Sequence, residues 1–397
     1  MNKFSLKLPS FIDFGWGSAN NLPIHVKKFG KNALVFTGSQ SLYDSGIADN
    51  IFSSLKESGV LFDAIKTQGE PSVSSIDRLV QMLRSDYDLT KYDAIVAIGG
   101  GSVIDAAKAV SAMIFESGSV ERYIENVGSA SLSGKTMPLI AVPSTAGSGS
   151  EATSSAIIAK PGENGFKSRL SHLSLMPQVA IVDPFLTITL PKETRTHCII
   201  ECLVQILEAY TSREANSYTD ALLVDALGFL AANMRKAVSE QESVSADVLE
   251  RLSYAALLSG MGAENSSIAA QHSIFHAIGS LYGIAHSAIC SAILYPTALI
   301  NMRKVQMLEP ESTTTAKFAM VGSIFSHMAY DENKHHVLLR AASQSLLKMS
   351  TDFALPKLRD LGIPKEDFYK IASSTVQEGN PVQLAETEII EILELSW

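Results

Sequence analysis

Three histidines lie close together in one mostly apolar stretch of the sequence, "QHSIFHAIGSLYGIAHS". His272 and His276 are four residues apart, on one face of an expected helix, and His286 follows His272 by 14 positions (286 minus 272). A single histidine in such a stretch is usually a packed core or surface residue, whereas three at this spacing favour a site. Imidazole binds transition metals and, with a pKa near ~6.5, exchanges protons near neutral pH. The cluster therefore predicts metal binding or proton transfer.

A glycine turn suggests a second kind of chemistry. In "AIVAIGGGSVIDAAKAV", a β-rich apolar run passes through Gly99, Gly100 and Gly101 into a helical pattern. Glycine lets the backbone approach a ligand closely, and a helix N-terminus offers unpaired N–H groups and partial positive charge. These properties suit a pyrophosphate, although the same glycines would also serve a tight turn without a ligand.

A second loop of small and hydroxyl-bearing residues, "PSTAGSGSE" at residues 143–151, also follows an apolar strand. In a doubly wound sheet, loops at the carboxyl ends of neighbouring strands converge on one crevice. Two such loops at one edge favour an extended ligand that lies across both of them, such as a dinucleotide.

The elements that position these loops alternate in the first half of the chain. Strand-like runs separated by helical patterns predict an α/β domain with a doubly wound parallel sheet over residues 1–184. After Pro184 the apolar residues recur at helical spacing, which predicts an all-helical domain over residues 185–397, with a helix beginning near Pro191. The expected strand segments begin at residues 32, 61, 92, 137 and 178.

Composition restricts the classes of partner. The 397 residues are 46% hydrophobic and 18% charged, and the net charge of −9 argues against binding to nucleic acid or an anionic membrane. No window approaches the ~18 to 20 apolar residues of a membrane span. Three cysteines, Cys198, Cys202 and Cys290, are few and odd in number, which predicts a cytoplasmic protein. Cys198 and Cys202 are four residues apart and could share a metal, but their apolar neighbours favour core packing.

Longer motifs carry a resemblance to a known family. "GGGSVIDAAKAV", "PLIAVPSTAGSGSEAT", "VAIVDPFLTITLP" and "GNPVQLAETEIIEIL" resemble the iron-containing (group III) alcohol dehydrogenases over nearly the whole chain. The resemblance implies a dinucleotide-binding domain, a helical domain and an active site in the cleft between them. It further implies reversible hydride transfer between a nicotinamide cofactor and a small alcohol/aldehyde pair, in a homodimer.

The resemblance also assigns the cofactor-binding residues. The pyrophosphate would rest on the glycine turn and the first residue after it, and Asp105 lies one turn into the following helix. The nicotinamide and its ribose would be lined by side chains of the second loop and by a lysine. The residues assigned in this way are Gly99, Gly100, Gly101, Ser102, Asp105, Ser144, Thr145, Ser148 and Lys167.

The family's metal ligands are only partly retained. The residues that match His272 and His286 are ligands in the family, and the residue that matches His276 lies near substrate and nicotinamide. The other two ligands are an aspartate and a histidine four residues apart, in a helix that ends in Glu-Ala-Tyr. In "IIECLVQILEAY" these positions hold Glu201 and Gln205. Glutamate keeps the carboxylate, whereas a glutamine oxygen is a weak neutral ligand in place of imidazole.

Two interpretations follow from this departure. In the first, Glu201, His272 and His286 bind Fe²⁺ or Zn²⁺, with Gln205 as a weak fourth ligand or a neighbour of the ligands. Three strong ligands and an open position are a normal catalytic arrangement. In the second, the metal is lost or weakly held, and a histidine donates a hydrogen bond to the developing alkoxide while Gln205 orients the substrate. His276 is the expected proton relay.

The residue after the first strand bears on cofactor choice. Relatives that prefer NAD commonly have an aspartate there, which bonds the adenosine ribose and repels a 2′-phosphate, but this chain has Gly38 followed by Ser39. The absence of that carboxylate favours NADP(H) over NAD(H). Hydroxyls of Thr37, Ser39 and Ser41 could bond the phosphate, although no arginine stands nearby in the sequence.

Substrate identity and two other classes of protein stay open. Some relatives with glutamine at the ligand position resemble phosphonoacetaldehyde reductases, and Lys167, Arg169 and His172 could serve an acidic aldehyde. A solvated loop is the plainer interpretation of Arg169 and His172. The alternatives are a dehydroquinate-synthase-like lyase, whose phosphate-gripping basic residues are not evident, and a nucleotide-binding protein with a degraded metal site and no redox turnover.

Overall fold

A six-stranded parallel sheet forms the centre of the N-terminal half of the chain. The computed structural model describes residues 3–38, 40–162, 165–239, 244–267, 269–284 and 286–397. The strand order is β1-β8-β5-β4-β2-β3, and every pair is parallel, which confirms the predicted doubly wound sheet. The strands are β1 (Phe11–Phe14), β2 (Asn32–Thr37), β3 (Leu61–Lys66), β4 (Ala94–Gly99), β5 (Leu139–Pro143) and β8 (Val179–Val182).

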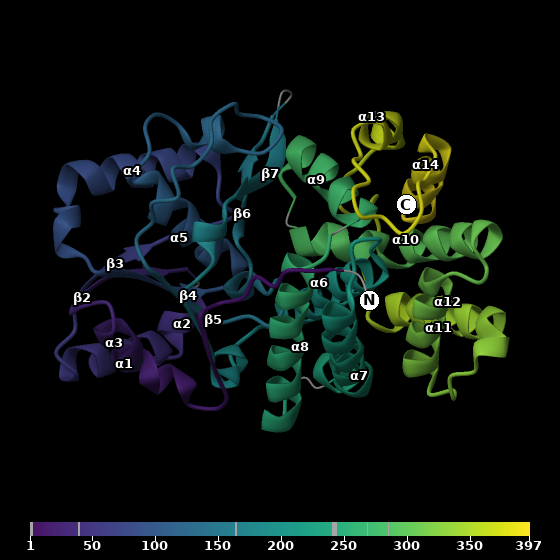
Figure 1. The fold of residues 1–397 in the computed structure, drawn as a ribbon, viewed down its shortest axis with the longest axis horizontal. Coiled ribbons are helices and arrows are strands. Elements are labelled where there is room, and N and C mark those ends of the chain that lie inside the picture. Colours follow the sequence, from purple (N-terminus) through teal and green to yellow (C-terminus); the bar gives the residue numbers. More distant parts are fainter. Residues whose placement is uncertain (1–2, 39, 163–164, 240–243, 268, 285) are drawn as a thin grey trace.

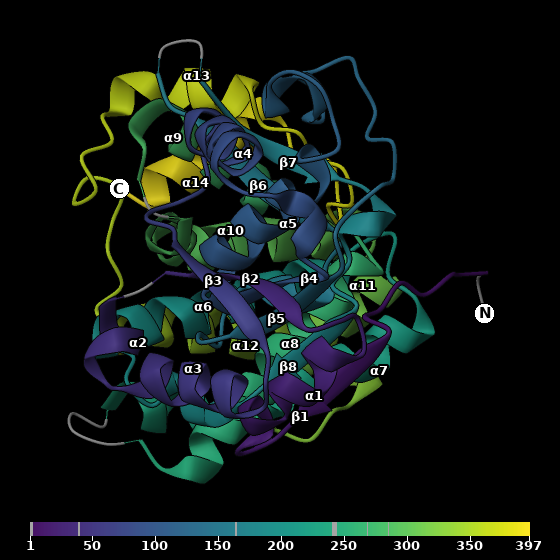
Figure 2. The same ribbon diagram turned by 90° about the vertical axis from the view of Figure 1, so that its left-hand side faces the viewer.

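The alternation of side chains along each strand explains why helices cover both faces of the sheet. Leu34 and Phe36 of β2 pack in the same core as α4 (Val73–Asp86) and α5 (Gly101–Met113). Ala33 and Val35 face the opposite core, shared with α1 (Leu22–Lys27) and α3 (Ile47–Glu57). Figures 1 and 2 show these two helical layers on opposite sides of the sheet. A strand buried on both faces is apolar over its buried centre, as β2 is from Ala33 to Phe36.

The C-terminal half is helical, as predicted, and has its own large core. Its first helix, α6, begins at Lys192, directly after Pro191. The N-terminal segment crosses to this half, where Lys7 and the side chain of Asn265 exchange hydrogen bonds of 2.6 and 2.8 Å. The helices are α6 (Lys192–Thr211), α7 (Ser217–Ser239), α8 (Ala246–Glu264), α9 (Ala270–Tyr282), α10 (His286–Leu308), α11 (Thr313–Ser326), α12 (His335–Asp352), α13 (Phe368–Ser373) and α14 (Glu386–Leu395).

Two features of the first half differ from the expectation. The sequence pattern did not predict β1 or the antiparallel hairpin of β6 (Ser155–Lys160) and β7 (Phe166–Ser171). The reason is clearest in β7, whose buried positions are Lys167 and Leu170, because a buried lysine breaks the apolar alternation that marks a strand. The hairpin packs against α9 of the helical half and so brings Lys167 to the boundary between the two halves. In the described parts of the chain, no helix is long and apolar enough to cross a membrane.

Candidate active site

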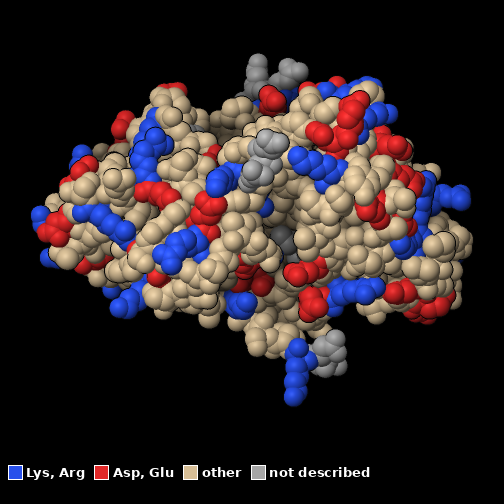
Figure 3. Space-filling model, turned by 90° about the horizontal axis from the view of Figure 1, so that it is seen from above, with Lys and Arg blue, Asp and Glu red and all other residues tan. Residues whose placement is uncertain are grey.

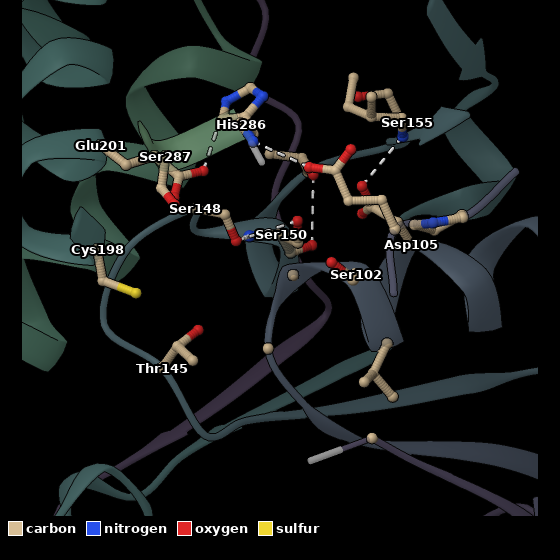
Figure 4. Close-up of a pocket in the computed structure, with 18 of the residues that line it drawn as sticks. Ser102, Asp105, Thr145, Ser148, Ser150, Ser155, Cys198, Glu201, His286 and Ser287 are labelled. Atoms are coloured by element: carbon tan, nitrogen blue, oxygen red, sulfur yellow. Dashed lines mark hydrogen bonds and ion pairs between the residues drawn. The ribbon is translucent and has the colours of Figure 1, made fainter. Parts of the chain in front are cut away.

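A cleft of about 980 Å³ lies between the two halves and gathers most of the predicted site residues. The sheet domain contributes the loops after β2, β3, β4 and β5, and the helical half contributes α6, α9 and the start of α10. Figure 4 shows Ser102 and Asp105 on one side of this cleft and Glu201 and His286 on the other. The predicted residues that line it are Gly38, Gly100, Gly101, Ser102, Asp105, Ser144, Thr145, Ser148, Lys167, Glu201, Gln205, His272 and His286.

The glycine turn brings two backbones together at the cleft. Helix α5 begins at Gly101, and the first N–H groups of a helix have no partner within it, so they can bind an anion. A Cβ at Gly101 would lie 2.5 Å from Ser148 Oγ, so only glycine lets the two loops approach this closely. Gly99 does not line the cleft; a Cβ there would lie 2.5 Å from a methyl carbon of Val103, so this glycine makes room for core packing.

The second loop, residues 143–151, is called the Ser/Thr loop below and is fixed at both ends. The Ser144 N–H donates to the Gly99 carbonyl (2.9 Å), which ties the loop to the end of β4. Gly149 has a left-handed φ of 65° and lies against α8, where a Cβ would be 2.5 Å from the Gly260 Cα. Between these points the loop presents Thr145 and Ser148 to the cleft. The loop is therefore held by the sheet on one side and by the helical domain on the other.

Glu208 orients His272 and leaves one of its nitrogens free. The carboxylate accepts a short hydrogen bond from His272 Nδ1, and it also accepts the backbone N–H groups of Gln271 (2.8 Å) and His272 (3.3 Å) at the start of α9. Because a carboxylate only accepts, the proton lies on Nδ1 and the lone pair of Nε2 is available to a ligand. This pattern of carboxylate behind histidine is common at metal sites.

Glu201 and His286 are paired on the helical side of the cleft, with 3.5 Å between Oε1 and Nε2 (Figure 4). Burial, reinforced by the charge of Glu70, raises the pKa of Glu201 to about 7. Burial and the positive charge of Lys167 hold the pKa of His286 well below its usual value, so this imidazole is neutral at pH 7. A neutral imidazole beside a carboxylate provides two ligand groups for a divalent cation.

Gln205 is locked by its amide nitrogen. Nε2 donates to the Ser148 carbonyl (3.1 Å) and to Ser259 Oγ (3.2 Å), so both amide hydrogens are used. The Ser259 hydroxyl in turn donates to Ala256, which fixes it as an acceptor for Gln205. The amide oxygen is consequently the group that Gln205 can offer to a ligand in the cleft.

Family models match both halves of the chain. The model "Iron-containing alcohol dehydrogenase" covers residues 9–184, and "Fe-containing alcohol dehydrogenase family, C-terminal" covers residues 197–397. The chain belongs to the iron-containing alcohol dehydrogenase family. This confirms the family that the sequence motifs predicted.

Similar proteins are matched over their full lengths. Long-chain-alcohol dehydrogenase 1 of Geobacillus thermodenitrificans is 27% identical over 410 residues, which covers 100% of this chain and 98% of that protein. NAD-dependent methanol dehydrogenase of Bacillus methanolicus is 26% identical, with coverage of 97% and 98%. The solved structure of a 1,3-propanediol oxidoreductase superimposes with a TM-score of 0.86 at 25% identity and covers 100% of both chains. The predicted fold class is confirmed.

The family implies a divalent metal, and the donor types at the site fit one. Two imidazoles and a carboxylate, from His272, His286 and Glu201, form the donor set typical of non-haem Fe²⁺, and the Gln205 oxygen adds a weak fourth ligand. The donors are not gathered in advance: no three or more His, Cys, Asp or Glu side chains stand at metal-binding spacing among the residues described. Binding a metal would therefore require these side chains to move together.

His276 occupies a different environment from the one expected of a relay. It does not line the cleft, and its Nε2 is buried with no hydrogen-bond partner among the described residues. Burial holds the pKa of His276 well below its usual value, so the value near ~6.5 assumed for a proton relay is wrong for this residue. At neutral pH this ring is an uncharged group with one unused nitrogen.

The remaining predicted residues have structural partners. Asp105 accepts the Ile157 N–H (3.0 Å) through Oδ2, while its other oxygen is buried without a hydrogen bond. Lys167 Nζ bonds Glu70 at 2.6 Å. Arg169 lines the cleft but pairs with Glu125 at 3.4 Å.

His172 lies outside the cleft-lining set, and its ring accepts the Ser174 N–H at 3.1 Å. This bond gives His172 a capping role in the turn after β7. Ser39, predicted to bind cofactor, lies outside the described residues.

Several residues that line the cleft were missed by sequence reasoning. Lys66 ends β3 beside Gly38, Glu70 follows in the next loop, and Glu264 ends α8. Glu70 precedes a proline at the carboxyl end of a strand, a position where a parallel sheet places ligand-binding residues. This position in the sequence is the signal from which Glu70 could have been predicted as a cleft residue.

The buried Glu151, at the end of the Ser/Thr loop, is expected to make the stability of the protein depend on pH. Burial raises the pKa of its carboxyl to about 7 from an ordinary value of 4.5. The folded protein then binds this proton more tightly than the unfolded chain does, so the free energy of unfolding falls as the pH rises from about 4.5 to about 7. We expect Glu151→Gln to remove this decline, which amounts to about 3 kcal/mol.

Urea unfolding at pH 5 and pH 8 measures the effect of that substitution. The variant should match the wild type at the lower pH and exceed its stability at the higher pH. Glu121→Gln, at an exposed pair with Lys160, is the control and should change little. Parallel pH dependence of Glu151→Gln and wild type would contradict the assignment.

Proposed function

We propose that this protein is a nicotinamide-dependent alcohol dehydrogenase that catalyses reversible hydride transfer between the cofactor and a small alcohol/aldehyde pair. One observation carries the proposal. A single cleft joins the open N-terminus of α5 to the side chains of Glu201, Gln205, His272 and His286. The first feature suits a dinucleotide diphosphate, and the second suits the oxygen of an alcohol or carbonyl.

Separate groups of residues would bind the diphosphate, the nicotinamide side of the cofactor and the metal. Backbone N–H groups at Gly101 and Ser102 bind the diphosphate, and Thr145 and Ser148 offer polar groups toward the nicotinamide side. A divalent metal held by Glu201, His272 and His286 would act as a Lewis acid on the substrate oxygen. His276, which does not line the cleft and whose buried Nε2 has no hydrogen-bond partner among the described residues, is given no step in this scheme.

An uncharged substrate fits the charges of the cleft better than an acidic one. Lys167 is neutralised by Glu70 and Arg169 by Glu125, so both cations already have carboxylate partners. Glu201 and Glu264 add further acidic groups to the lining. We therefore propose a simple alcohol or diol in preference to phosphonoacetaldehyde, although that aldehyde belongs in any substrate panel.

For the cofactor we propose NADP(H). Gly38 provides no carboxylate to repel a 2′-phosphate, and the adjacent strand supplies a cation. Lys66 pairs with Thr37 in the β2–β3 register, and its ammonium donates to Gln40 Oε1 at 2.7 Å. Lys66 and Gln40 both line the cleft next to Gly38. The name of the methanol dehydrogenase relative specifies NAD. The proposal of NADP(H) therefore rests on the residues of this chain and not on that relative.

The cofactor proposal is tested by Lys66→Ala. Loss of a charge-assisted hydrogen bond to the 2′-phosphate should raise the KM for NADPH about five- to tenfold and leave the KM for NADH within about twofold. Lys160→Ala is the control, since Lys160 is also an exposed strand lysine but pairs with Glu121. Equal effects on both cofactors would contradict the assignment of Lys66.

The activity is tested with purified protein whose metal content is measured first. NADPH and NADH are each offered with propanal, butanal, 3-hydroxypropanal and phosphonoacetaldehyde, before and after loading with Fe²⁺ or Zn²⁺. Oxidation of the reduced cofactor by an uncharged aldehyde is the expected result. Saturable quenching of cofactor fluorescence without turnover would instead favour a nucleotide-binding protein with a degraded metal site. This alternative is tested because Gln205 replaces a histidine ligand and the other donor side chains are not yet at metal-binding spacing.

We propose that the two domains divide near residue 185. We further propose that the protein acts as a homodimer in the cytoplasm, without nucleic-acid or membrane partners. Figure 3 shows acidic and basic side chains intermingled on the face seen from above, and the net charge is −9. Such a surface offers no extended basic patch on this face for a polyanion.

A further inference from the structure

Glu70 joins three separate parts of the chain at the cleft. It lies in the loop between β3 and α4, and its two carboxylate oxygens have different partners. Oε2 accepts a hydrogen bond from Lys167 Nζ at 2.6 Å, and Oε1 accepts the backbone N–H of His286 at 3.1 Å. One side chain of the sheet domain thus contacts both the β6–β7 hairpin and the first residue of α10.

The partner lysine depends on this carboxylate. The Lys167 side chain is 2% exposed, and it reaches Glu70 by passing over Gly279 of α9, where a Cβ would lie 3.1 Å from the lysine Cδ. A larger residue at position 279 would crowd this path. A buried ammonium group without a counterion is strongly unfavourable, so Glu70 compensates the charge that the fold places here.

The contact with α10 fixes the backbone of a predicted metal ligand. His286 is the first residue of α10, so its N–H has no acceptor within the helix. A carboxylate at a helix N-terminus is also favoured by the helix dipole. From this anchored backbone, the His286 side chain extends to Glu201. The position of the imidazole in the cleft therefore depends on the loop that carries Glu70.

We propose that Glu70 is a positioning residue for the reaction, which sets the distance between the cofactor side of the cleft, at Lys167, and the imidazole of His286. This rests on the proposed dehydrogenase function. Hydride transfer is sensitive to such distances, and a displacement of about 1 Å can cost about 100-fold in rate. One carboxylate thus links Lys167 directly to the backbone of His286.

Glu70→Gln is the principal test, because it keeps the size and the acceptor oxygen but removes the charge that Lys167 needs. We expect kcat with NADPH and the best aldehyde to fall about tenfold or more, with the KM for aldehyde and the Kd for NADPH within about threefold. Glu121→Gln is the control, since Glu121 also pairs with a lysine, Lys160, but lies outside the residues that line the cleft. It should retain wild-type kinetics.

Hydrogen–deuterium exchange gives a readout that does not depend on activity. The amide of His286 and its neighbours, residues 286–290, should exchange faster in Glu70→Ala than in the wild type or in Glu121→Gln. Glu70→Asp keeps the charge but is one methylene shorter, so it should show an intermediate loss of kcat if the Gln variant does not fold. If the wild type shows no turnover but residues 286–290 still exchange faster in Glu70→Ala, the dehydrogenase function is refuted, while the anchoring of His286 by Glu70 is supported. Unchanged exchange and kcat, or an equal loss of binding and kcat, would overturn the proposal for Glu70.

Discussion

Gly260→Ala is expected to weaken NADPH binding about tenfold or more and to lower the free energy of unfolding by about 1–3 kcal/mol. Gly260 lies on α8, and a Cβ there would be 2.2 Å from the carbonyl oxygen of Gly149. Gly149 holds a φ of 65°, and its own Cβ position is blocked by Gly260, so neither backbone can yield easily. The methyl group would push the Ser/Thr loop away from the helical domain.

The loss of binding follows from what that loop carries. Ser148 packs on Gly101 at the start of α5 and accepts the amide hydrogen bond of Gln205. A shift of the loop therefore disturbs both the diphosphate side and the metal side of the cleft. Equilibrium binding of NADPH, followed by fluorescence, and urea unfolding measure the two effects.

Gly228→Ala provides the matched control. Gly228 also lies inside a long helix of the same domain, α7, but it is exposed, and nothing lies within 4 Å of a Cβ placed there. The greater helix propensity of alanine should raise stability by about 0.5–1 kcal/mol and leave binding unchanged. Unaltered NADPH affinity in Gly260→Ala would show that the second loop does not contribute to the cofactor site.

Gln205→His is expected to strengthen metal retention about tenfold or more. Imidazole is a far better ligand for Fe²⁺ or Zn²⁺ than a neutral amide oxygen, and position 205 lines the same cleft as Glu201, His272 and His286. The substitution loses the bonds from Gln205 Nε2 to Ser148 and Ser259, but a ring N–H can replace one of them. A fourth strong donor also favours the gathered arrangement of the other three.

Elemental analysis after dialysis against graded chelator measures this effect. Gln81→His, which adds an imidazole on the exposed surface of α4, controls for non-specific metal binding. Equal metal content in wild type, Gln205→His and Gln81→His at every chelator concentration would show that Glu201, His272 and His286 do not hold a metal together. In that case a protein hydrogen bond would have to polarise the substrate.

The architecture was predictable because its signals are local. The apolar strand before Gly99 and the helical period after Pro191 each reflect burial of neighbouring residues, and both elements are found. The β6–β7 hairpin was missed because Lys167 occupies a buried position, and a buried charge has no signature in an apolar pattern. Its partner, Glu70, is 97 residues away, so the ion pair appears only once the fold is known.

The site was only partly predictable, for a related reason. Spacing placed His272 and His276 on one helical turn, but it could not show that His272 lines the cleft while the His276 Nε2 is buried without a partner among the described residues. The pKa of each histidine depends on burial and on charges such as Lys167, which arrive from other elements. Glycines were similarly ambiguous: Gly101 adjoins the second loop, whereas Gly99 makes room for Val103.

A structure of the protein in complex with NADPH tests the central claim most directly. The account predicts that the diphosphate accepts hydrogen bonds from the amides of Gly101 and Ser102, and that the nicotinamide ring passes Thr145 to face His272 and His286. A cofactor bound in a second cavity, lined by Lys192 and Leu361, or a ring turned away from both imidazoles, would contradict it.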